Sequence, residues 1–193
     1  MSPARKLRPV SVADYLAGEL NSPVRHEFVN GWIEAMSGGT LAHARIAGNI
    51  YKALSDRLPD GPCEAFNSDA KVKLKSNEGT WFYYPDASVS CSPGDQEETY
   101  LTSVTAVFEV LSPSTRRIDQ GEKKAVYLAH PPLAVYALVE TDEPRVTVFR
   151  RAGEEFVTEE YEGLDAVLPL PEIGAELPLA EIYRRVEFSP AGE

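Results

Sequence analysis

Apolar residues recur at two different spacings along the chain, and these spacings predict both helices and strands. Between residues 40 and 58 the apolar positions include every fourth residue, which is typical of a helix with one buried face. The residues of that face are Ile46, Ile50 and Leu54. Residues 11–20 predict an earlier helix, because Ser11 supplies a side-chain cap for its first turn. Later helices are expected over residues 115–128 and 180–185.

Strand-like patterns fill the space between these helices. Asn30-Gly31 separates two short β-like runs in RHEFVNGWIEAM, which is a strong short-range sign of a hairpin. Residues 70–75 alternate between lysine and mainly apolar side chains, so one face of that strand is buried. The run TAVFEVLSPS is apolar around Glu109, which predicts a central strand buried on both faces. Other strands are expected over residues 81–91, 133–140, 145–151 and 154–161.

The order of these elements predicts the fold class. Helix, hairpin, helix, several strands, helix and further strands together suit an α+β (mixed α/β) domain, in which helices flank a central mixed sheet. The 193 residues fit one domain of ordinary size, and no internal repeat or linker divides them.

Three features bear on where the protein is found. No apolar run approaches the roughly 20 residues that a membrane helix needs, so no membrane partner is expected. The basic N-terminus lacks the apolar core of a secretory signal. Cys63 and Cys91 form no CxxC pattern. A reducing cytoplasm is therefore the expected compartment.

Acidic residues are concentrated near the C-terminus. The net charge of −11 argues against a nucleic-acid partner, because phosphate binding depends on Lys and Arg. However, residues 140–193 hold 14 acidic and 5 basic residues, whereas residues 1–139 hold 16 acidic and 14 basic. The composition therefore leaves room for a local basic surface in the front of the chain.

Glu109 is the residue that points most directly to chemistry. A carboxylate within an apolar strand is costly unless it is paired or bound to a cation. Asp86, which follows Pro85 in a second β-like run, supplies another carboxylate for a hard oxygen site suited to Mg²⁺ or Mn²⁺. The alternative is that Glu109 forms a buried salt bridge, with Lys123 or Arg25 as its partner.

The segments around these acids resemble a known family. Pro85-Asp86, followed some twenty residues later by Glu109, is similar to the PD-(D/E)XK motif of the restriction-endonuclease-like superfamily. RHEFVNGWIEAMSGG, a His-containing helix, YYPDASV and VFEVLSPSTRRIDQGEKKAVY resemble, in this order, the Uma-type family of restriction-endonuclease-like proteins. The similarity covers about residues 12–138. It implies a restriction-endonuclease-like core within a single domain, followed by an acidic extension over residues 139–193.

The resemblance implies roles at the matching positions. Asp86 and Glu109 would be metal ligands, and the backbone carbonyl of Val110 commonly completes such a site. The chain departs from the superfamily pattern at Leu111, which stands two residues after Glu109 where a lysine is usual. The Uma-type proteins look as if they carry this lysine on the following helix, where Lys123 stands in this chain. The alternative for Lys123 is a solvated helix lysine.

Spacing and resemblance also bring in second-rank candidates. Tyr127 lies four residues after Lys123 on one helix face, so Lys123 is expected to face the sheet while Lys124 points elsewhere. Glu27 resembles a supplementary ligand of the family, although a surface-strand glutamate is the alternative. His43 lies on the inward face of its helix, either as a hydrogen-bonded core residue or at the rim of the site.

Basic residues suggest a surface for phosphates. Alternate positions of one strand and the helix after Glu109 carry positive charge and could form a phosphate-binding track beside the site. The residues are Lys71, Lys73, Lys75, Arg116, Arg117 and Lys124. The alternative is that these side chains are merely solvated.

Two functions follow as hypotheses. The first is a Mg²⁺- or Mn²⁺-dependent endonuclease that hydrolyses phosphodiester bonds in nucleic acid, with DNA favoured and Asp86, Glu109 and Lys123 as the catalytic residues. The second is a catalytically silent nuclease fold that acts as a dimeric binding module, which Leu111 and the acidic net charge favour. A homodimer is expected in either case, because symmetric dimers are common and the apolar strands of the last third could pack against a partner.

Overall fold

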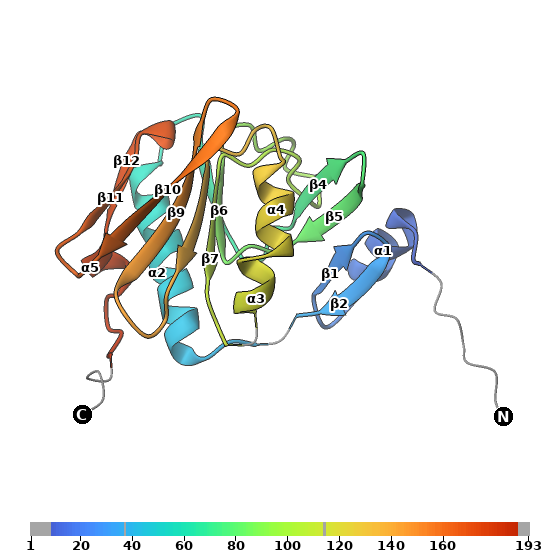
Figure 1. Ribbon diagram of the computed structural model, residues 1–193. Coiled ribbons are helices and arrows are strands. Elements are labelled where there is room, and N and C mark those ends of the chain that lie inside the picture. The colour runs from blue at the N-terminus through green and yellow to red at the C-terminus, as the bar shows by residue number, and fades with distance from the viewer. Residues whose placement is uncertain (1–8, 37, 114, 189–193) are drawn as a thin grey trace.

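Two β-sheets form the framework of the protein, seen in a computed structural model that describes residues 9–36, 38–113 and 115–188 (Figure 1). The main sheet has the strand order β10-β9-β8-β7-β6-β3, in which only β7 and β8 run parallel. Its strands are β3 (Glu64–Asn67), β6 (Ala87–Ser90), β7 (Ala106–Val110), β8 (Val135–Val139), β9 (Arg145–Ala152) and β10 (Glu155–Glu162). The predicted α+β class with a central mixed sheet is therefore confirmed.

A smaller antiparallel sheet lies beside the main one, with the order β2-β1-β5-β4. Its strands are β1 (His26–Val29), β2 (Trp32–Ala35), β4 (Val72–Ser76) and β5 (Gly79–Tyr83). The predicted hairpin joins β1 to β2. Asn30 and Gly31 have φ angles of 46° and 98°, the left-handed region that a tight two-residue hairpin requires and that Asn-Gly adopts readily.

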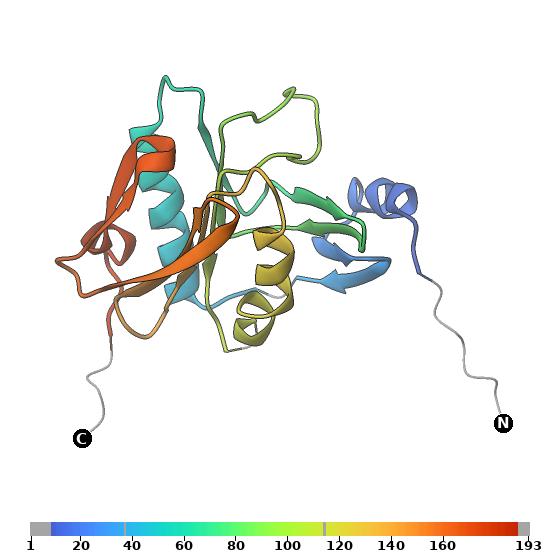
Figure 2. The same cartoon turned by 45° about the horizontal axis from the view of Figure 1, so that its top comes forward.

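Helices cover both faces of the main sheet, as the turned view makes clear (Figure 2). One face packs against α2 (Leu41–Arg57), α5 (Leu179–Ile182) and the β11–β12 hairpin (Val167–Leu170 and Ala175–Pro178). The other face packs against α4 (Glu122–Leu128), which follows α3 (Arg116–Asp119), and against β4 and β5. α1 (Val12–Glu19) covers the far side of the small sheet. Ser11 caps α1 through its side chain, as predicted, and Thr40 caps α2 in the same way.

β7 lies in the interior of the main sheet, and all five of its residues are buried. Its alternate residues Ala106, Phe108 and Val110 pack on the α2 side. Val107, by contrast, packs on the α4 side. Because side chains alternate along a strand, Glu109 also faces α4. The predicted central strand is thus confirmed, and its acid points toward the helix that carries Lys123.

Three elements differ from the sequence prediction. The run 81–91 is split, because β5 and β6 belong to different sheets and Asp86 lies in a bend between them rather than in a strand. The single helix expected over 115–128 is two helices that meet at Gly121. Residues 167–178, for which no strand was expected, form β11, the 3-10 helix η1 (Pro171–Ile173) and β12, because alternate leucines of the hairpin are fully buried against the main sheet.

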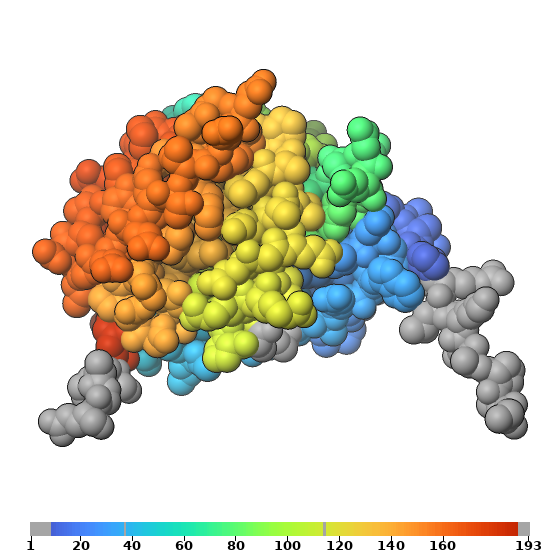
Figure 3. Space-filling model, in the orientation of Figure 1, coloured from blue at the N-terminus to red at the C-terminus, as the bar shows by residue number. Residues whose placement is uncertain are grey.

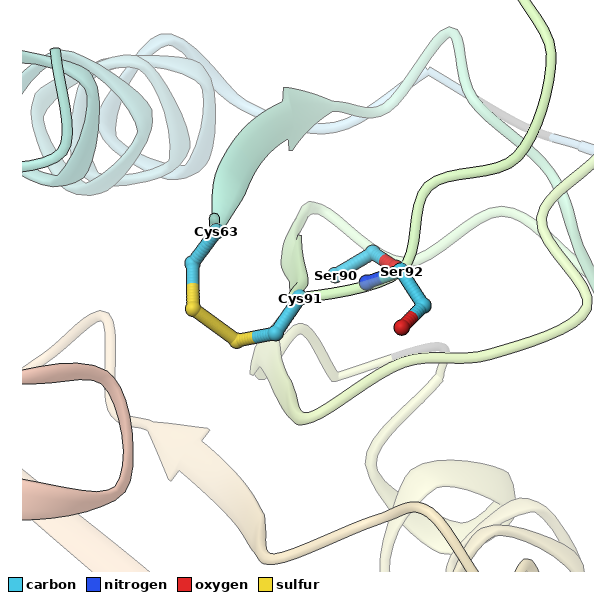
Figure 4. The surroundings of a disulfide bond; sticks show 4 residues. All are labelled: Cys63, Ser90, Cys91 and Ser92. Atoms are coloured by element: carbon cyan, nitrogen blue, oxygen red, sulfur yellow. A yellow bond between two sulfur atoms is a disulfide. The ribbon is translucent and has the colours of Figure 1, made fainter. Parts of the chain in front are cut away.

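Cys63 and Cys91 form a disulfide at the edge of the main sheet (Figure 4). The register Glu64↔Ser90 of β3 and β6 places these two cysteines directly opposite one another, just beyond the strand ends. A cross-strand pair of this kind leaves no local sequence motif, so the lack of a CxxC pattern did not reveal the bond. None of the helices within the described ranges is long and apolar enough to cross a membrane.

Replacing Gly121 by Ala should destabilise the fold. A Cβ at this position would lie 2.8 Å from the carbonyl oxygen of Arg117, and a backbone atom cannot move aside cheaply. We expect the free energy of unfolding to fall by about 1–3 kcal/mol, the usual cost of overpacking. Urea denaturation would measure it, with Gly48→Ala as the control because a Cβ there meets nothing within 4 Å. An equal response of both variants would contradict the steric reason for the α3–α4 break.

Candidate active site

A cavity of about 390 Å³ opens where the chain passes from the small sheet to the main sheet. Its walls come from the β1–β2 hairpin, the start of α2, the bend before β6, the end of β7, and α3 with α4. The charged side chains that line it are Glu27, Glu34, His43, Asp86, Glu109, Asp119 and Lys123. Five acids therefore face one lysine and one histidine, and the cavity is strongly acidic.

Asp86 lies opposite Glu109, since the antiparallel register pairs Ala87 with Phe108. The backbone N–H of Val110 donates to Asp86 Oδ2 at 2.8 Å, which holds the carboxylate at the end of β7. His43, in the first turn of α2, places Nε2 3.2 Å from the same oxygen. Hydrogen bonding to Asp86 raises the pKa of His43, against an opposing effect of burial, and a hydrogen bond to the Val110 backbone adds to the rise.

Glu109 is only 3% exposed and forms the floor of the cavity. Lys123 Nζ lies 3.0 Å from its Oε1, but without the geometry of a hydrogen bond. Burial raises the pKa of Glu109 well above its usual range, and the nearby Lys123 only partly opposes this. Glu109 Oε1 is thus a buried oxygen with no hydrogen-bond donor among the described residues.

Lys123 is 5% exposed and sits among three carboxylates. Its Nζ lies 3.0 Å from Glu27 Oε1, 3.0 Å from Glu109 Oε1 and 3.9 Å from Asp119 Oδ1. Burial lowers the pKa of Lys123, but these carboxylates, Glu109 first, more than reverse that effect and hold it well above its ordinary value. Lys124 points elsewhere, with Nζ 4.4 Å from the centre of the Phe149 ring.

The alternative for Glu109, a buried salt bridge, is present. Its partner is Lys123, whereas Arg25 pairs with Asp69 instead. Glu27 faces the cavity rather than the open surface, and its Oε1 accepts from both Lys123 Nζ and the backbone N–H of Tyr84. The Lys123 ammonium would therefore compete with a metal ion for Glu109 Oε1.

Asp119 belongs to the cavity but was missed from the sequence. It is buried, and burial raises the pKa of its carboxyl while Lys123 and a hydrogen bond from Thr115 oppose the rise. The sequence feature that could have identified Asp119 is its position four residues before Lys123. That spacing suggested little, because the break at Gly121 that turns both side chains into the cavity was not foreseen.

The predicted phosphate-binding residues lie outside the cavity lining. Arg116 is engaged by Glu140, with Nη1 2.8 Å from Oε1. Lys71 is buried, and Lys73 Nζ lies 5.0 Å from the centre of the Tyr100 ring. The other three are Lys75, Arg117 and Lys124. Arg117 is exposed on α3 beside the cavity residues Thr115 and Ile118.

The donor set fits a hard divalent cation. Asp86 and Glu109 line the cavity with carboxylate oxygens, and the backbone carbonyl of Val110, the next residue of β7, is a third candidate ligand outside the cavity lining. Mg²⁺ and Mn²⁺ prefer oxygen ligands of this kind. No group of three or more His, Cys, Asp or Glu side chains in the described residues is arranged to hold a metal. That finding is compatible with Mg²⁺, which commonly binds through one or two carboxylates and completes its shell with water and substrate phosphate.

Comparison with known proteins identifies the family. The Uma2 family, described as "Putative restriction endonuclease", matches residues 12–180. The uncharacterized Synechocystis protein slr1290 is 32% identical over 189 residues, which is 97% of this chain and 98% of that protein. A second Synechocystis protein, sll1609, is 27% identical over 148 residues, which is 75% of this chain and 82% of that protein.

A solved structure shares the fold. It is a crystal structure from Anabaena variabilis described as "a putative nuclease belonging to DUF820". It superposes with a TM-score of 0.71 at 19% identity and covers 91% of this chain and 98% of its own. The matches in sequence and in fold show that this chain is a member of the Uma2 family with a restriction-endonuclease-like fold.

Proposed function

We propose that the protein is a divalent-metal-dependent endonuclease that hydrolyses phosphodiester bonds in nucleic acid, with DNA as the favoured substrate. One observation carries the proposal: the buried Glu109 lies opposite Asp86 in an open cavity and keeps one oxygen without a hydrogen-bond donor among the described residues. The Lys123 ammonium lies 3.0 Å from this oxygen but without hydrogen-bond geometry, so a buried carboxylate oxygen remains that a further cation would stabilise. Membership of a family described as restriction endonucleases supports the same chemistry.

Each residue of the cavity has a proposed task. Asp86, Glu109 and the Val110 carbonyl would hold Mg²⁺ or Mn²⁺, which when bound supplies water activation and neutralises charge on the phosphate. Lys123 would place its ammonium beside the scissile phosphate and stabilise the charge that develops there. Glu27 would position the Lys123 ammonium through their ion pair, and His43 would fix the orientation of Asp86.

The contacts outside the cavity are also proposals. Because the cavity is acidic, a phosphodiester would enter it only once a cation offsets the carboxylates. Contacts to the nucleic-acid phosphates would then come from the predicted basic residues that remain accessible, such as the exposed Arg117, next in sequence to the cavity residue Ile118. For the compartment we propose the cytoplasm, where thiols are kept reduced and the Cys63–Cys91 bond is expected to open.

Addition of Mn²⁺ should raise the melting temperature of the wild type but not of Glu109→Gln. A ligand that binds only the folded state adds about 2.7 kcal/mol of stability at one hundred times its Kd. Asp69→Asn is the matched control, since Asp69 is an exposed acid outside the cavity and should leave the shift unchanged. Cleavage of single- and double-stranded DNA and RNA with Mg²⁺ then tests turnover. Equal shifts in wild type and Glu109→Gln would contradict the metal site.

A second candidate function is a catalytically silent nuclease fold that binds nucleic acid or protein. The observation that favours it is Leu111, which is fully buried at the position of the usual lysine, while Lys123 is already surrounded by carboxylates. This function predicts that the wild type has no cleavage activity for Asp86→Ala or Glu109→Ala to remove. Both variants should keep or raise the free energy of unfolding, because buried like charges cost free energy. The same melting and cleavage series separates the two functions.

We also propose a homodimer, to be tested by sedimentation velocity. Symmetric dimers are the commonest assemblies. The apolar strands of the last third of the chain, from which a dimer was expected, do not support it in the structure. β8 is buried within the main sheet, and the edge strand β10 carries Glu155, Glu159, Glu160 and Glu162. Charged edges of this kind discourage strand pairing with another chain.

A further inference from the structure

A large aromatic side chain is left in water beside the cavity. Trp32 is 49% exposed, whereas the chain's other tryptophan, Trp81, is 7% exposed and packs in the core. Trp32 begins β2, an edge strand whose four residues are all exposed. A half-exposed tryptophan on an edge strand is a candidate contact for a partner.

The hairpin register places Trp32 on the cavity side of the small sheet. β1 and β2 pair Val29 with Trp32 and Glu27 with Glu34. Because alternate residues share a face, Trp32 lies on the same face as Glu34 and Glu27, which line the cavity. Ile33 lies on the opposite face, opposite Phe28. Trp32 is two positions along the strand from Glu34, or about 7 Å.

The two sides of the cavity mouth differ in chemistry. α3 contributes Ile118 to the lining, and its N-cap contributes Thr115. The helix also carries the exposed Arg117, which suits a phosphate. The hairpin side offers Glu34, which repels phosphate, and the aromatic face of Trp32. The space-filling view shows the atoms of the β1–β2 hairpin (blue) and of α3 (yellow-green) on the same side of the molecule (Figure 3). A nucleobase, rather than a phosphate, matches the hairpin side.

We propose that Trp32 stacks on an unpaired base of the nucleic acid whose phosphodiester enters the cavity. This inference rests on the proposed nuclease function and narrows its substrate to single-stranded or locally unpaired nucleic acid. Every base has a π-face, so stacking on an exposed aromatic ring contributes affinity whatever the base sequence of the nucleic acid. A base inside a regular duplex is covered by its neighbours, and so it does not present that face.

Tryptophan fluorescence tests the stacking directly, because Trp32 and Trp81 are the only tryptophans. The full chain would be titrated with a single-stranded DNA oligonucleotide and with a blunt duplex, with Ca²⁺ in place of Mg²⁺ to limit cleavage. We expect the single strand to quench the wild type. Trp32→Phe should lose the quench but keep affinity within a few-fold. Trp32→Ala should lose about tenfold or more in affinity.

Ile33→Ala is the matched control, since Ile33 is an exposed apolar residue on the other face of the same strand. It should bind as the wild type does. If wild type binds DNA and Trp32→Ala binds equally, or if Trp32→Phe is still quenched, the inference fails while the nuclease proposal stands. Equal quenching by the duplex overturns the unpaired base. A loss of dimer in Trp32→Ala with unchanged DNA affinity shows a self-contact instead. If the wild type binds no nucleic acid, the proposed function fails as well.

Discussion

Replacing Lys123 by Met is expected to lower the free energy of unfolding by about 3–5 kcal/mol, the cost of removing one partner from a buried ionic cluster. Lys123 is the one cation in contact with Glu27, Glu109 and Asp119 among the described residues. Methionine keeps most of the side-chain volume, so the loss measures charge rather than a cavity. Urea denaturation at neutral pH gives the value.

The neighbouring residue supplies a matched control for this change. Lys124 is on the same helix but points away from the cavity, with its ammonium over Phe149. Lys124→Met should therefore cost no more than about 1 kcal/mol, the scale of an exposed cation–π contact. A loss below 1 kcal/mol for Lys123→Met would show that the three carboxylates are not held charged by this lysine.

The same variant separates a metal site from a purely structural ion cluster. If Asp86 and Glu109 bind a divalent cation, Mn²⁺ should restore part of the stability lost in Lys123→Met, because it replaces the missing positive charge. The upward shift in melting temperature should exceed that of the wild type, in which the ammonium competes for the same oxygens. A silent fold predicts no such recovery, so this readout bears on the metal site without requiring cleavage.

Much of the framework could be predicted because it depends on local signals. The Asn30-Gly31 turn, the caps at Ser11 and Thr40 and the buried strand around Glu109 each follow from the preferences of a few adjacent residues. The pairing of Asp86 with Glu109 was one of two alternatives that their β-like runs suggested, and the resemblance to a family favoured it. It could not be derived locally, because 22 residues, including an irregular loop, separate the two acids.

The remaining features depend on how distant segments pack. The split between β5 and β6 sends one β-like run into two sheets, and only the tertiary fold decides where the chain crosses. Asp119 lines the cavity because the helix breaks at Gly121, and no sequence pattern predicted the φ and ψ angles of that residue. Trp32 looked like any strand aromatic until the order β2-β1-β5-β4 showed that its strand is an edge.

Reducing the Cys63–Cys91 bond is expected to lower the free energy of unfolding by about 2–4 kcal/mol. The bond closes a loop in which the cysteines are 28 positions apart, and the loss of that constraint gives the unfolded chain more freedom. It also joins β3, the edge strand, to β6, whose other end leads to Asp86. Urea denaturation with and without reductant measures the effect, after a thiol assay of the unfolded protein shows that the bond is formed.

The double variant Cys63→Ser/Cys91→Ser is the control for the reductant itself. Its stability should match that of the reduced wild type to within about 1 kcal/mol and should not respond to reductant. Asp86 lies in the bend directly before β6. The Mn²⁺-induced shift in the melting temperature of the double variant therefore shows whether the disulfide also supports the cavity. An unchanged shift would mean that the pairing of Asp86 with the Val110 N–H and His43 is enough to hold the site, as the contacts predict. A wild type whose stability does not change on reduction would show that β3 stays in place through its strand pairing alone.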